Sequence, residues 1–279
     1  MIFKPFGEAL AAAYGKALPG RRFEVVETAG SVSNLERLEA GEAELGLALA
    51  DVAYMGYNGH IAELPERARR IRGIAVLQPS TVHVLVARDS HIRSLADLRG
   101  QRVGVGPVGS GTAVTSAILL RSVGVKAGEV RQRALPFLTA TEELNRGDLD
   151  AVFITASYPV AVVQKAMLAG ARLLDITGPP LVDLHVTYPF LRPATIPAKT
   201  YPGQSKPVGT VQVHVLLLCR ADLDDLVVHD LTSALFELLP ELAAHGDYLR
   251  RIDVRRAPAT PIPLHPGAAW YYREQELSR

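Results

Sequence analysis

The stretch that most constrains the fold is segment 103–112, Val-Gly-Val-Gly-Pro-Val-Gly-Ser-Gly-Thr. A short β-branched run enters a loop with four glycines, and a helix pattern starts directly after it. A helix N-terminus carries unpaired N–H groups and about half a positive charge, and glycines let a carboxylate or phosphate come close. No Lys follows the last glycine, so the segment is not a Walker A loop. A tight turn capped by Thr112 is the alternative interpretation.

Composition narrows the class of protein. The chain has 279 residues, enough for one large or two ordinary domains, and 48% hydrophobic against 21% charged residues indicate a packed globular protein. A net charge of +1 gives no electrostatic argument for nucleic acid or an anionic membrane. The single cysteine, Cys219, excludes an internal disulfide and a multi-thiolate metal site. No apolar run approaches the roughly 18 residues that span a bilayer.

Helix and strand patterns alternate along the chain, which predicts α/β architecture with parallel sheets. Strands are expected at 23–27, 45–50, 71–77, 81–87, 131–135, 151–155, 171–176 and 211–219, and helices at 7–17, 35–39, 94–100, 113–122, 139–146, 160–168 and 225–244. Segment 191–208 is dense in Pro, Gly and Thr and is expected to be irregular. Segments 38–44 and 144–150 share a Leu-x-x-Gly-acidic pattern, which suggests two similar lobes, although a generic helix-to-strand turn explains it nearly as well.

Several segments in the same order resemble one family, the TAXI-type solute-binding proteins of tripartite ATP-independent periplasmic (TRAP) transporters. Each segment is weakly specific by itself, and together they extend over essentially the whole chain. The matching segments are Ala-Gly-Ser-Val-Ser-Asn-Leu at 29–35, Gly-Glu-Ala-Glu-Leu-Gly at 41–46, Ala-Asp-Val-Ala-Tyr at 50–54, Tyr-Asn-Gly at 57–59, Ser-Leu-Ala-Asp-Leu-Arg-Gly at 94–100, the glycine loop at 103–112, Tyr-Pro at 158–159, the Pro-rich stretch at 193–204 and Pro-Ile-Pro-Leu-His-Pro-Gly-Ala at 261–268.

The resemblance implies a type II periplasmic-binding-protein fold, an α/β fold with two lobes joined by a hinge around a ligand cleft. Lobe I would take 1–86 plus 210–279, and lobe II 87–209. The family implies a periplasmic, non-enzymatic receptor without cofactor or metal. It would bind a small carboxylate, such as glutamate, another amino acid or a dicarboxylate, and deliver it to the membrane permease subunits of a TRAP transporter. Closure around the ligand would shift the population of open and closed forms.

Departures from the family pattern leave the ligand open. The family's mature chain usually begins with a strand and a Gly-Thr-Tyr-Tyr-Pro loop, whereas this sequence opens with Ile-Phe-Lys-Pro at 2–5, which is not a signal peptide. We therefore expect a signal peptide and a first strand upstream of Met1. Leu49 stands where the family commonly has Gln, and Gln-Pro-Ser at 78–80 where it has Tyr-Pro-Glu. Lys4, in place of an expected Tyr, is a candidate partner for an anionic group.

The candidate ligand-binding residues follow from the resemblance and from the helix N-termini. For Ser31 and Asn34 the alternative role is helix capping, and for Asp51, which could receive a ligand amine, it is capping of the following turn. For Tyr158 the alternative is a core tyrosine, and Tyr201 is a candidate lid contact. The full set is Lys4, Ser31, Asn34, Asp51, Gly109, Ser110, Gly111, Thr112, Ser157, Tyr158 and Tyr201.

No enzymatic constellation is visible in the sequence. Ser157 lacks a Gly-x-Ser-x-Gly elbow, and the histidines lack metal-site spacing. His83 and His214 lie on apolar strand patterns and are expected to be core residues. Two other functions stay possible from the sequence: an enzyme on the same fold acting on a phosphorylated substrate, and a ligand-sensing domain of a longer regulatory chain.

Overall fold

The computed structural model describes residues 3–61, 64, 68–245 and 247–277. The chain divides into two compact units: unit 1 comprises 1–79 and 214–279, and unit 2 comprises 80–213. Strands β2 (Ile71–Ala87) and β8 (Val208–Arg220) each begin in one unit and end in the other. The division into lobes expected from the sequence, 1–86 plus 210–279 and 87–209, stays a prediction.

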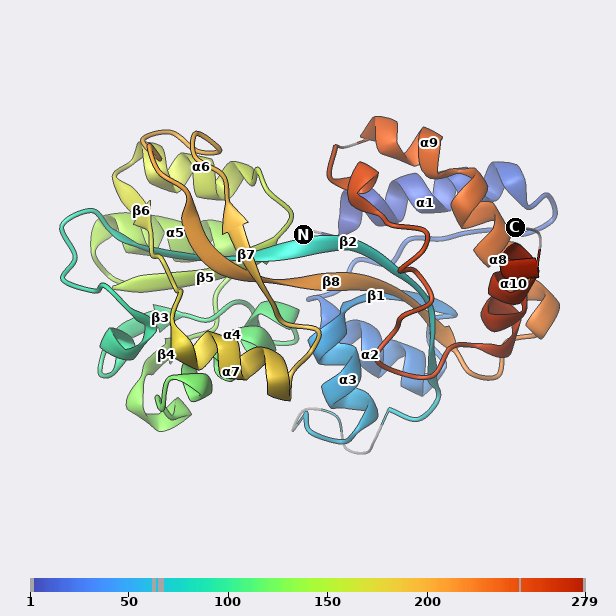
Figure 1. Cartoon of the computed structure of the whole chain (residues 1–279), viewed down its shortest axis with the longest axis horizontal. Helices are drawn as coiled ribbons and strands as arrows, with labels where there is room; N and C mark the ends of the chain where they lie inside the picture. Colours follow the sequence, from blue (N-terminus) through green and yellow to red (C-terminus); the bar gives the residue numbers. More distant parts are fainter. Residues whose placement is uncertain (1–2, 62–63, 65–67, 246, 278–279) are drawn as a thin grey trace. The chain divides into compact units, whose positions relative to one another are not determined.

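Unit 1 surrounds a short buried strand, β1, with helices on both of its sides (Figure 1). Strand β1 pairs antiparallel with β8, from Leu45 opposite Cys219 to Leu49 opposite Val215. Besides parts of β2 and β8, the elements of unit 1 are α1 (Lys4–Ala17), α2 (Ser31–Ala40), β1 (Leu45–Leu49), α3 (Ala50–Tyr57), α8 (Asp225–Glu237), α9 (Leu239–Leu242) and α10 (Pro266–Leu277), with 3-10 turns at Ala243–His245 and Asp247–Arg251.

Unit 2 has a central group of strands with α5 and α6 on one side and α4 and α7 on the other (Figure 1). Its elements are a 3-10 turn at Leu95–Leu98, β3 (Arg102–Gly104), α4 (Gly111–Ser122), a 3-10 turn at Ala127–Glu129, β4 (Arg131–Arg133), α5 (Phe137–Arg146), β5 (Ala151–Ala156), α6 (Ala161–Leu168), β6 (Ala171–Leu173), α7 (Pro179–Thr187) and β7 (Arg192–Ile196).

Strand pairing in unit 2 is mixed, which corrects the expectation of purely parallel sheets. Strand β3 pairs parallel with β4 and β5, as the sequence predicted for a strand–helix–strand order. Strand β2 pairs antiparallel with β5 and β6, and β7 pairs antiparallel with β8. All six residues of β5 are buried, so this strand is covered on both faces, which explains its continuous apolar run.

Four predicted segments have different bounds or a different structure from those expected. The two strands expected at 71–77 and 81–87 are one continuous strand, β2, because Pro79 is accommodated within it. The helix expected at 225–244 ends at Glu237, and a separate turn of helix, α9, starts before Pro240, whose ring cannot continue the hydrogen-bond pattern of α8. Segment 191–208, expected to be irregular, contains strand β7.

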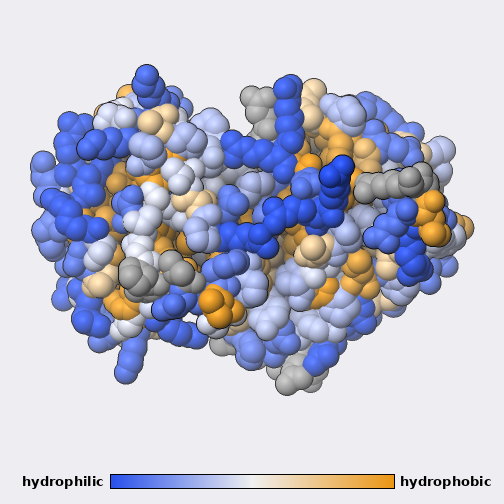
Figure 2. All heavy atoms as spheres, in the orientation of Figure 1, coloured by the Kyte–Doolittle hydropathy of each residue, from blue (hydrophilic) through white to orange (hydrophobic). Residues whose placement is uncertain are grey.

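The strand expected at 23–27 is absent from the strand pairings of the described residues. Its backbone joins no strand ladder among the described residues, and Val25 and Val26 are 40% and 53% exposed. Figure 2 shows hydrophobic residues at the surface between hydrophilic ones over α1 and α9 of the same unit. None of the helices in the described parts of the chain is long and apolar enough to cross a membrane.

Candidate functional site

The N-terminus of α4 follows the carboxyl end of β3, as predicted from segment 103–112. The turn between them depends on Gly106, which has φ +99°, a conformation that favours glycine. A Cβ at this position would lie 2.9 Å from both Ser110 Oγ and Thr112 Cβ. The backbone of the loop is therefore packed directly against the two hydroxyl residues of the helix start.

The two hydroxyls at the helix start each accept one hydrogen bond from the backbone. Ser110 is the N-cap and its Oγ accepts from the N–H of Ala113 at 3.3 Å. Thr112 Oγ1 accepts from the N–H of Thr155 at 3.2 Å, which ties the helix start to the end of β5. A hydroxyl that accepts still carries its own hydrogen to donate. Together with the first-turn N–H groups, the helix start thus offers several neutral donors for an anion.

Thr155 adds a buried hydroxyl that the sequence analysis missed. Its side chain is only 4% exposed, and its Oγ1 has no hydrogen-bond partner among the residues that the structure describes. The same is true of Ser80, which is 1% exposed. Val82 is the Cα partner of Thr155, and residues 80 and 82 share one face of β2, so Ser80 and Thr155 lie on the same face of the sheet. A buried hydroxyl without a partner costs about 1–3 kcal/mol, and a polar ligand would remove that cost.

Ser157 and Tyr158 directly follow the carboxyl end of β5, beside Thr155. Strands β3 and β5 are parallel, so their carboxyl ends lie at one edge of the sheet, where ligands of α/β proteins bind. Unit 2 therefore brings five predicted residues and the unpredicted Thr155 to a single edge. The predicted residues are Ser110, Gly111, Thr112, Ser157 and Tyr158, and Gly109 lies in the preceding loop with φ +77°.

Unit 1 has a comparable meeting of helix N-termini at the end of β1. Helix α2 starts at Ser31, and Ser31 Oγ accepts a hydrogen bond of 3.1 Å from the N–H of Leu49, the last residue of β1. Helix α3 starts one residue later, and the buried Asp51 in its first turn accepts from the N–H of Val52 at 2.9 Å. Both predicted residues thus lie together, each with a local structural role beside the proposed one.

Asn34 uses both atoms of its amide within unit 1. Its Nδ2 donates to the carbonyl of Leu47 at 2.6 Å, and its Oδ1 accepts from Thr28 Oγ1 at 2.6 Å. Lys4 is similarly engaged, because its ammonium lies 2.8 Å from the Glu27 carboxylate on the surface. Their hydrogen bond and mutual charge raise the pKa of Lys4 and lower the pKa of Glu27. A ligand that contacts either residue would have to compete with these partners.

Tyr201 is a core residue of unit 2 rather than an exposed side chain. It is 3% exposed, and its hydroxyl lies 2.8 Å from His83 Nε2 and accepts from the N–H of Val160 at 3.1 Å. Burial lowers the pKa of His83 to about 4, so the imidazole is neutral near pH 7, with Nδ1 bonded to the carbonyl of Thr81. This confirms His83 as a satisfied core histidine. The predicted ligand contact of Tyr201 would require one of these bonds to be replaced.

The arrangement of unit 2 is suited to holding an anion through neutral donors. Its polar groups are hydroxyls and helix N–H groups, which act at short range and discriminate by geometry. Within the described parts of the chain, no group of three or more His, Cys, Asp or Glu side chains is placed to hold a metal ion.

Several solved protein structures have a fold similar to that of this chain. One similar structure is the periplasmic aliphatic sulphonate binding protein SsuA from Escherichia coli, at 17% identity over 99% of this chain and 91% of that chain, with a TM-score of 0.50. An ancestral arginine-binding protein bound to arginine is 18% identical over 88% and 87%, with a TM-score of 0.54. XAC2383 from Xanthomonas citri bound to ATP is 12% identical over 98% and 94%, with a TM-score of 0.58.

At these identities the similarity establishes the fold, which is the α/β fold of type II periplasmic binding proteins. The family expected from the sequence motifs was one of solute-binding proteins, and the similar structures named above include two ligand-binding proteins. The sequence of this chain matches the NMT1-like family over residues 3–275. Because that match extends over nearly the whole chain, the protein belongs to the NMT1-like family.

Proposed function

We propose that this protein is the solute-binding subunit of a TRAP-type transporter of the TAXI kind. In this proposal it captures a small carboxylate-bearing metabolite in the periplasm and hands it to membrane permease subunits, without catalysing a reaction. The ligand class includes glutamate, other amino acids and dicarboxylates. The observation that carries the proposal is the N-terminus of α4, where Ser110 and Thr112 offer hydroxyl donors beside the buried, unpartnered hydroxyl of Thr155.

A carboxylate suits these donors better than a phosphate does. A carboxylate has one charge, which a helix N-terminus and two or three neutral hydrogen bonds can offset. A phosphate has up to two charges and is usually held with the help of Lys or Arg side chains. Segment 103–112 contains neither residue, and the strand-end residues 155–158, Thr-Ala-Ser-Tyr, contain none either.

Unit 1 is proposed to contribute further contacts through Ser31, Asn34, Asp51 and Lys4, with Ser157, Tyr158 and Tyr201 completing the set from unit 2. An acidic residue such as Asp51 would suit the ammonium group of an amino acid. The division into lobes at 1–86 plus 210–279 and 87–209 belongs to the same proposal, since a solute-binding protein closes around its ligand.

The ligand class can be tested by thermal-shift titration of the whole chain. The panel contains glutamate and other amino acids, dicarboxylates and 2-oxo acids, with an alkanesulfonate and phosphorylated compounds for comparison. A ligand at 100 times its Kd stabilises the folded state by about 2.7 kcal/mol, which is a readily measured rise in Tm. Stabilisation by one or more carboxylates supports the proposal. A response only to phosphorylated compounds contradicts it.

A second experiment asks whether the carboxylate lies at α4. Ser110→Asp and Ser110→Asn introduce side chains of nearly equal size that cap helices about equally well, so both variants should fold. Only the aspartate brings a negative charge, and two charges about 4 Å apart at an effective dielectric constant of 20 repel by about 4 kcal/mol. We expect S110D to bind the carboxylate roughly 100-fold or more weakly than S110N. Equal affinities would remove α4 from the site.

A further inference from the structure

The loop at 197–206 in unit 2 is held in one shape by the side chain of Gln204. This side chain is 7% exposed, and its amide oxygen accepts a hydrogen bond of 3.2 Å from the N–H of Tyr201. Its amide nitrogen donates at 3.0–3.1 Å to the carbonyls of Ile196, Pro197 and Lys206. Because both ends of the amide bond the backbone of the same loop, the loop is a fixed base for the Tyr201 side chain.

The hydroxyl of Tyr201 forms two hydrogen bonds whose directions follow from His83. His83 Nδ1 lies 3.0 Å from the carbonyl oxygen of Thr81 and 3.3 Å from that of Ile154. Carbonyl oxygens accept and do not donate, so Nδ1 carries the hydrogen. Burial lowers the pKa of His83 to about 4, so the ring is neutral near pH 7 and Nε2 is an acceptor. The Tyr201 hydroxyl therefore donates to Nε2 across 2.8 Å, and its oxygen accepts from the N–H of Val160 at 3.1 Å.

Val160 ends a short segment that carries two of the proposed ligand contacts. Segment 157–160 joins the end of β5 to the start of α6, and it contains Ser157 and Tyr158, both half-buried. Val160 is also the N-cap residue of α6, and the N–H groups at a helix start have no partner within the helix. Tyr201 supplies this partner from 41 residues further along the chain. The end of segment 157–160 is thereby attached to the loop at 197–206 and, through His83, to β2.

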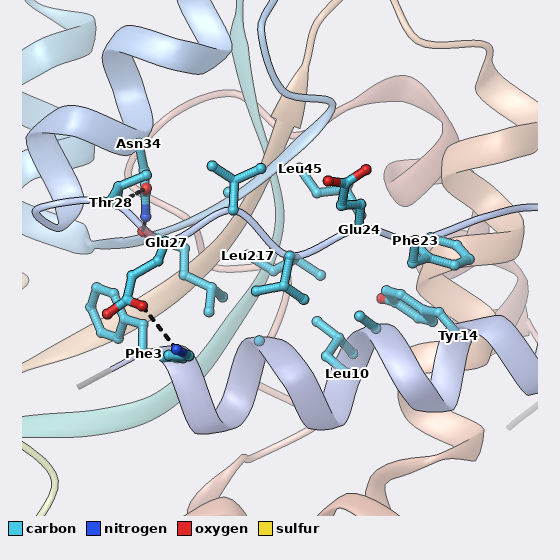
Figure 3. A pocket seen from close by; sticks show the side chains of 17 residues that line it. Phe3, Leu10, Tyr14, Phe23, Glu24, Glu27, Thr28, Asn34, Leu45 and Leu217 are labelled. Atoms are coloured by element: carbon cyan, nitrogen blue, oxygen red, sulfur yellow. Dashed lines mark hydrogen bonds and ion pairs between the residues drawn. The ribbon is translucent and has the colours of Figure 1, made fainter. Parts of the chain in front are cut away.

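Two other buried tyrosines show that such a pair of hydrogen bonds is not a general result of burial. Tyr14 in unit 1 is 1% exposed, and its hydroxyl has no hydrogen-bond partner among the described residues. Figure 3 shows Tyr14 beside Phe23, and no dashed line reaches its hydroxyl. Tyr272, also buried in unit 1, donates one hydrogen bond of 2.9 Å to the carbonyl of Ile74. Tyr201 differs from both, because its hydroxyl connects two other segments of the chain.

We infer that Tyr201 is a positioning residue of the ligand site: its hydroxyl, oriented by His83, holds segment 157–160 in the conformation that contacts the ligand. The inference rests on the proposed function, since it concerns the same edge of unit 2. The hydroxyl has given its single hydrogen to His83, so Tyr201 acts through segment 157–160 and not by donating to the ligand. A segment that is already ordered raises affinity, because less conformational freedom is lost on binding.

Three Tyr→Phe variants of the whole chain test the inference. Thermal shifts are measured with L-glutamate, succinate and 2-oxoglutarate, and calorimetry gives the Kd of each acid that raises Tm. We expect Tyr201→Phe to lower Tm by about 2 °C or more and to weaken binding at least tenfold. Hydrogen exchange at the amide of Val160 should become at least tenfold faster in this variant. Tyr272→Phe should lower Tm and leave Kd unchanged, and Tyr14→Phe should leave Kd unchanged without lowering Tm.

His83 variants separate positioning from direct contact and from loss of stability alone. In His83→Gln the side-chain amide oxygen can replace Nε2 as acceptor, so the Tyr201 hydroxyl keeps its orientation and the Kd should stay within about twofold of the parent value. His83→Leu removes the acceptor with a side chain of similar size, so binding should weaken at least tenfold. If Tyr201 contacted the ligand directly, His83→Leu would free its hydroxyl and keep or raise the affinity. That result would overturn the inference.

The outcomes distinguish this inference from the proposed function. A parent chain that responds to none of the three acids refutes the proposed function and the positioning role together. A parent chain that binds one of them, with the same Kd in Tyr201→Phe, refutes the positioning role alone. Equal losses of affinity in Tyr201→Phe and Tyr272→Phe would also overturn it, since the effect would then follow from lower stability and not from segment 157–160.

Discussion

Replacing Gly106 by alanine is the most informative single change in the α4 site. Gly106 has φ +99°, and a left-handed backbone costs an L residue about 1–2 kcal/mol. The new methyl group would also lie 2.9 Å from Ser110 Oγ and from Thr112 Cβ, closer than Cβ contacts allow. Overpacking of this kind typically costs a further 1–3 kcal/mol. We expect Gly106→Ala to lower the free energy of unfolding by roughly 2–5 kcal/mol.

The matched control is Gly124→Ala, just beyond the other end of α4. Gly124 has φ +76°, and a Cβ there meets nothing within 4 Å, so this variant carries the backbone cost alone, about 1–2 kcal/mol. Urea unfolding followed by circular dichroism measures both changes, and calorimetric titration with a carboxylate from the panel measures affinity. Gly106→Ala should also weaken binding at least tenfold, about 1.4 kcal/mol, because Ser110 and Thr112 must shift. Equal losses in the two variants, with equal affinities, would refute crowding at the helix start.

Four further predictions concern the interiors of the two units. Tyr201→Phe should lower the free energy of unfolding by about 1–3 kcal/mol, since His83 Nε2 and the N–H of Val160 lose their hydrogen-bond partner. The pKa of His83 is lowered from 6.5 to about 4, so the unfolded chain binds its proton at a higher pH than the folded chain does, and stability should fall as the pH drops from about 6.5 to about 4. Urea titrations at several pH values should show this fall, and His83→Gln should remove it. Gly209→Ala places a Cβ against Thr177 Cγ2, closer than Cβ contacts allow, and should cost about 1–3 kcal/mol in urea unfolding. Thr177→Ser on that background should recover most of the loss by removing the methyl group. Cys219 is fully buried and burial raises the pKa of its thiol to about 12, so a thiol reagent should react only as fast as the protein opens, with rapid reaction of the native protein contradicting the buried position.

Local patterns predicted most elements of the fold because their causes are local. Segment 103–122 was predicted as strand, glycine loop and helix, and it forms β3, the loop and α4. The short helix expected at 94–100 forms as a 3-10 turn at Leu95–Leu98, with a capping box between Ser94 and Asp97. Where the prediction from the sequence was wrong, the cause lay in contacts with distant parts of the chain. Segment 23–27 has a strand composition but no hydrogen-bonded neighbour among the described residues, and β2 continues through Pro79 because the sheet holds both sides of it.

At the α4 site, the residues of the helix start could be predicted from the sequence, and the residue of strand β5 could not. Ser110 and Thr112 stand in a recognisable glycine loop, whereas Thr155 is one threonine in an apolar strand pattern. What distinguishes Thr155 is that its N–H bonds Thr112 while its hydroxyl remains buried without a partner, and both facts depend on the pairing of β5 with its neighbours. A threonine at the carboxyl end of a strand next to a glycine loop is the one sequence signal that could have indicated it.

Ser31 and Asn34, two of the predicted ligand residues of unit 1, illustrate why a sequence motif alone does not separate a binding role from a structural one. Ser31 and Asn34 stand one helical turn apart at the start of α2, so their side chains reach in the same direction. In the structure that direction is the edge of β1, where they bond the N–H of Leu49 and the carbonyl of Leu47. Ser31 keeps a hydroxyl hydrogen to donate, but one donor and one acceptor of the Asn34 amide are already used. Ser31 is therefore the better candidate for direct contact with a ligand. Asn34 is the better candidate for a structural role, which is to hold the edge of β1 that Ser31 also binds.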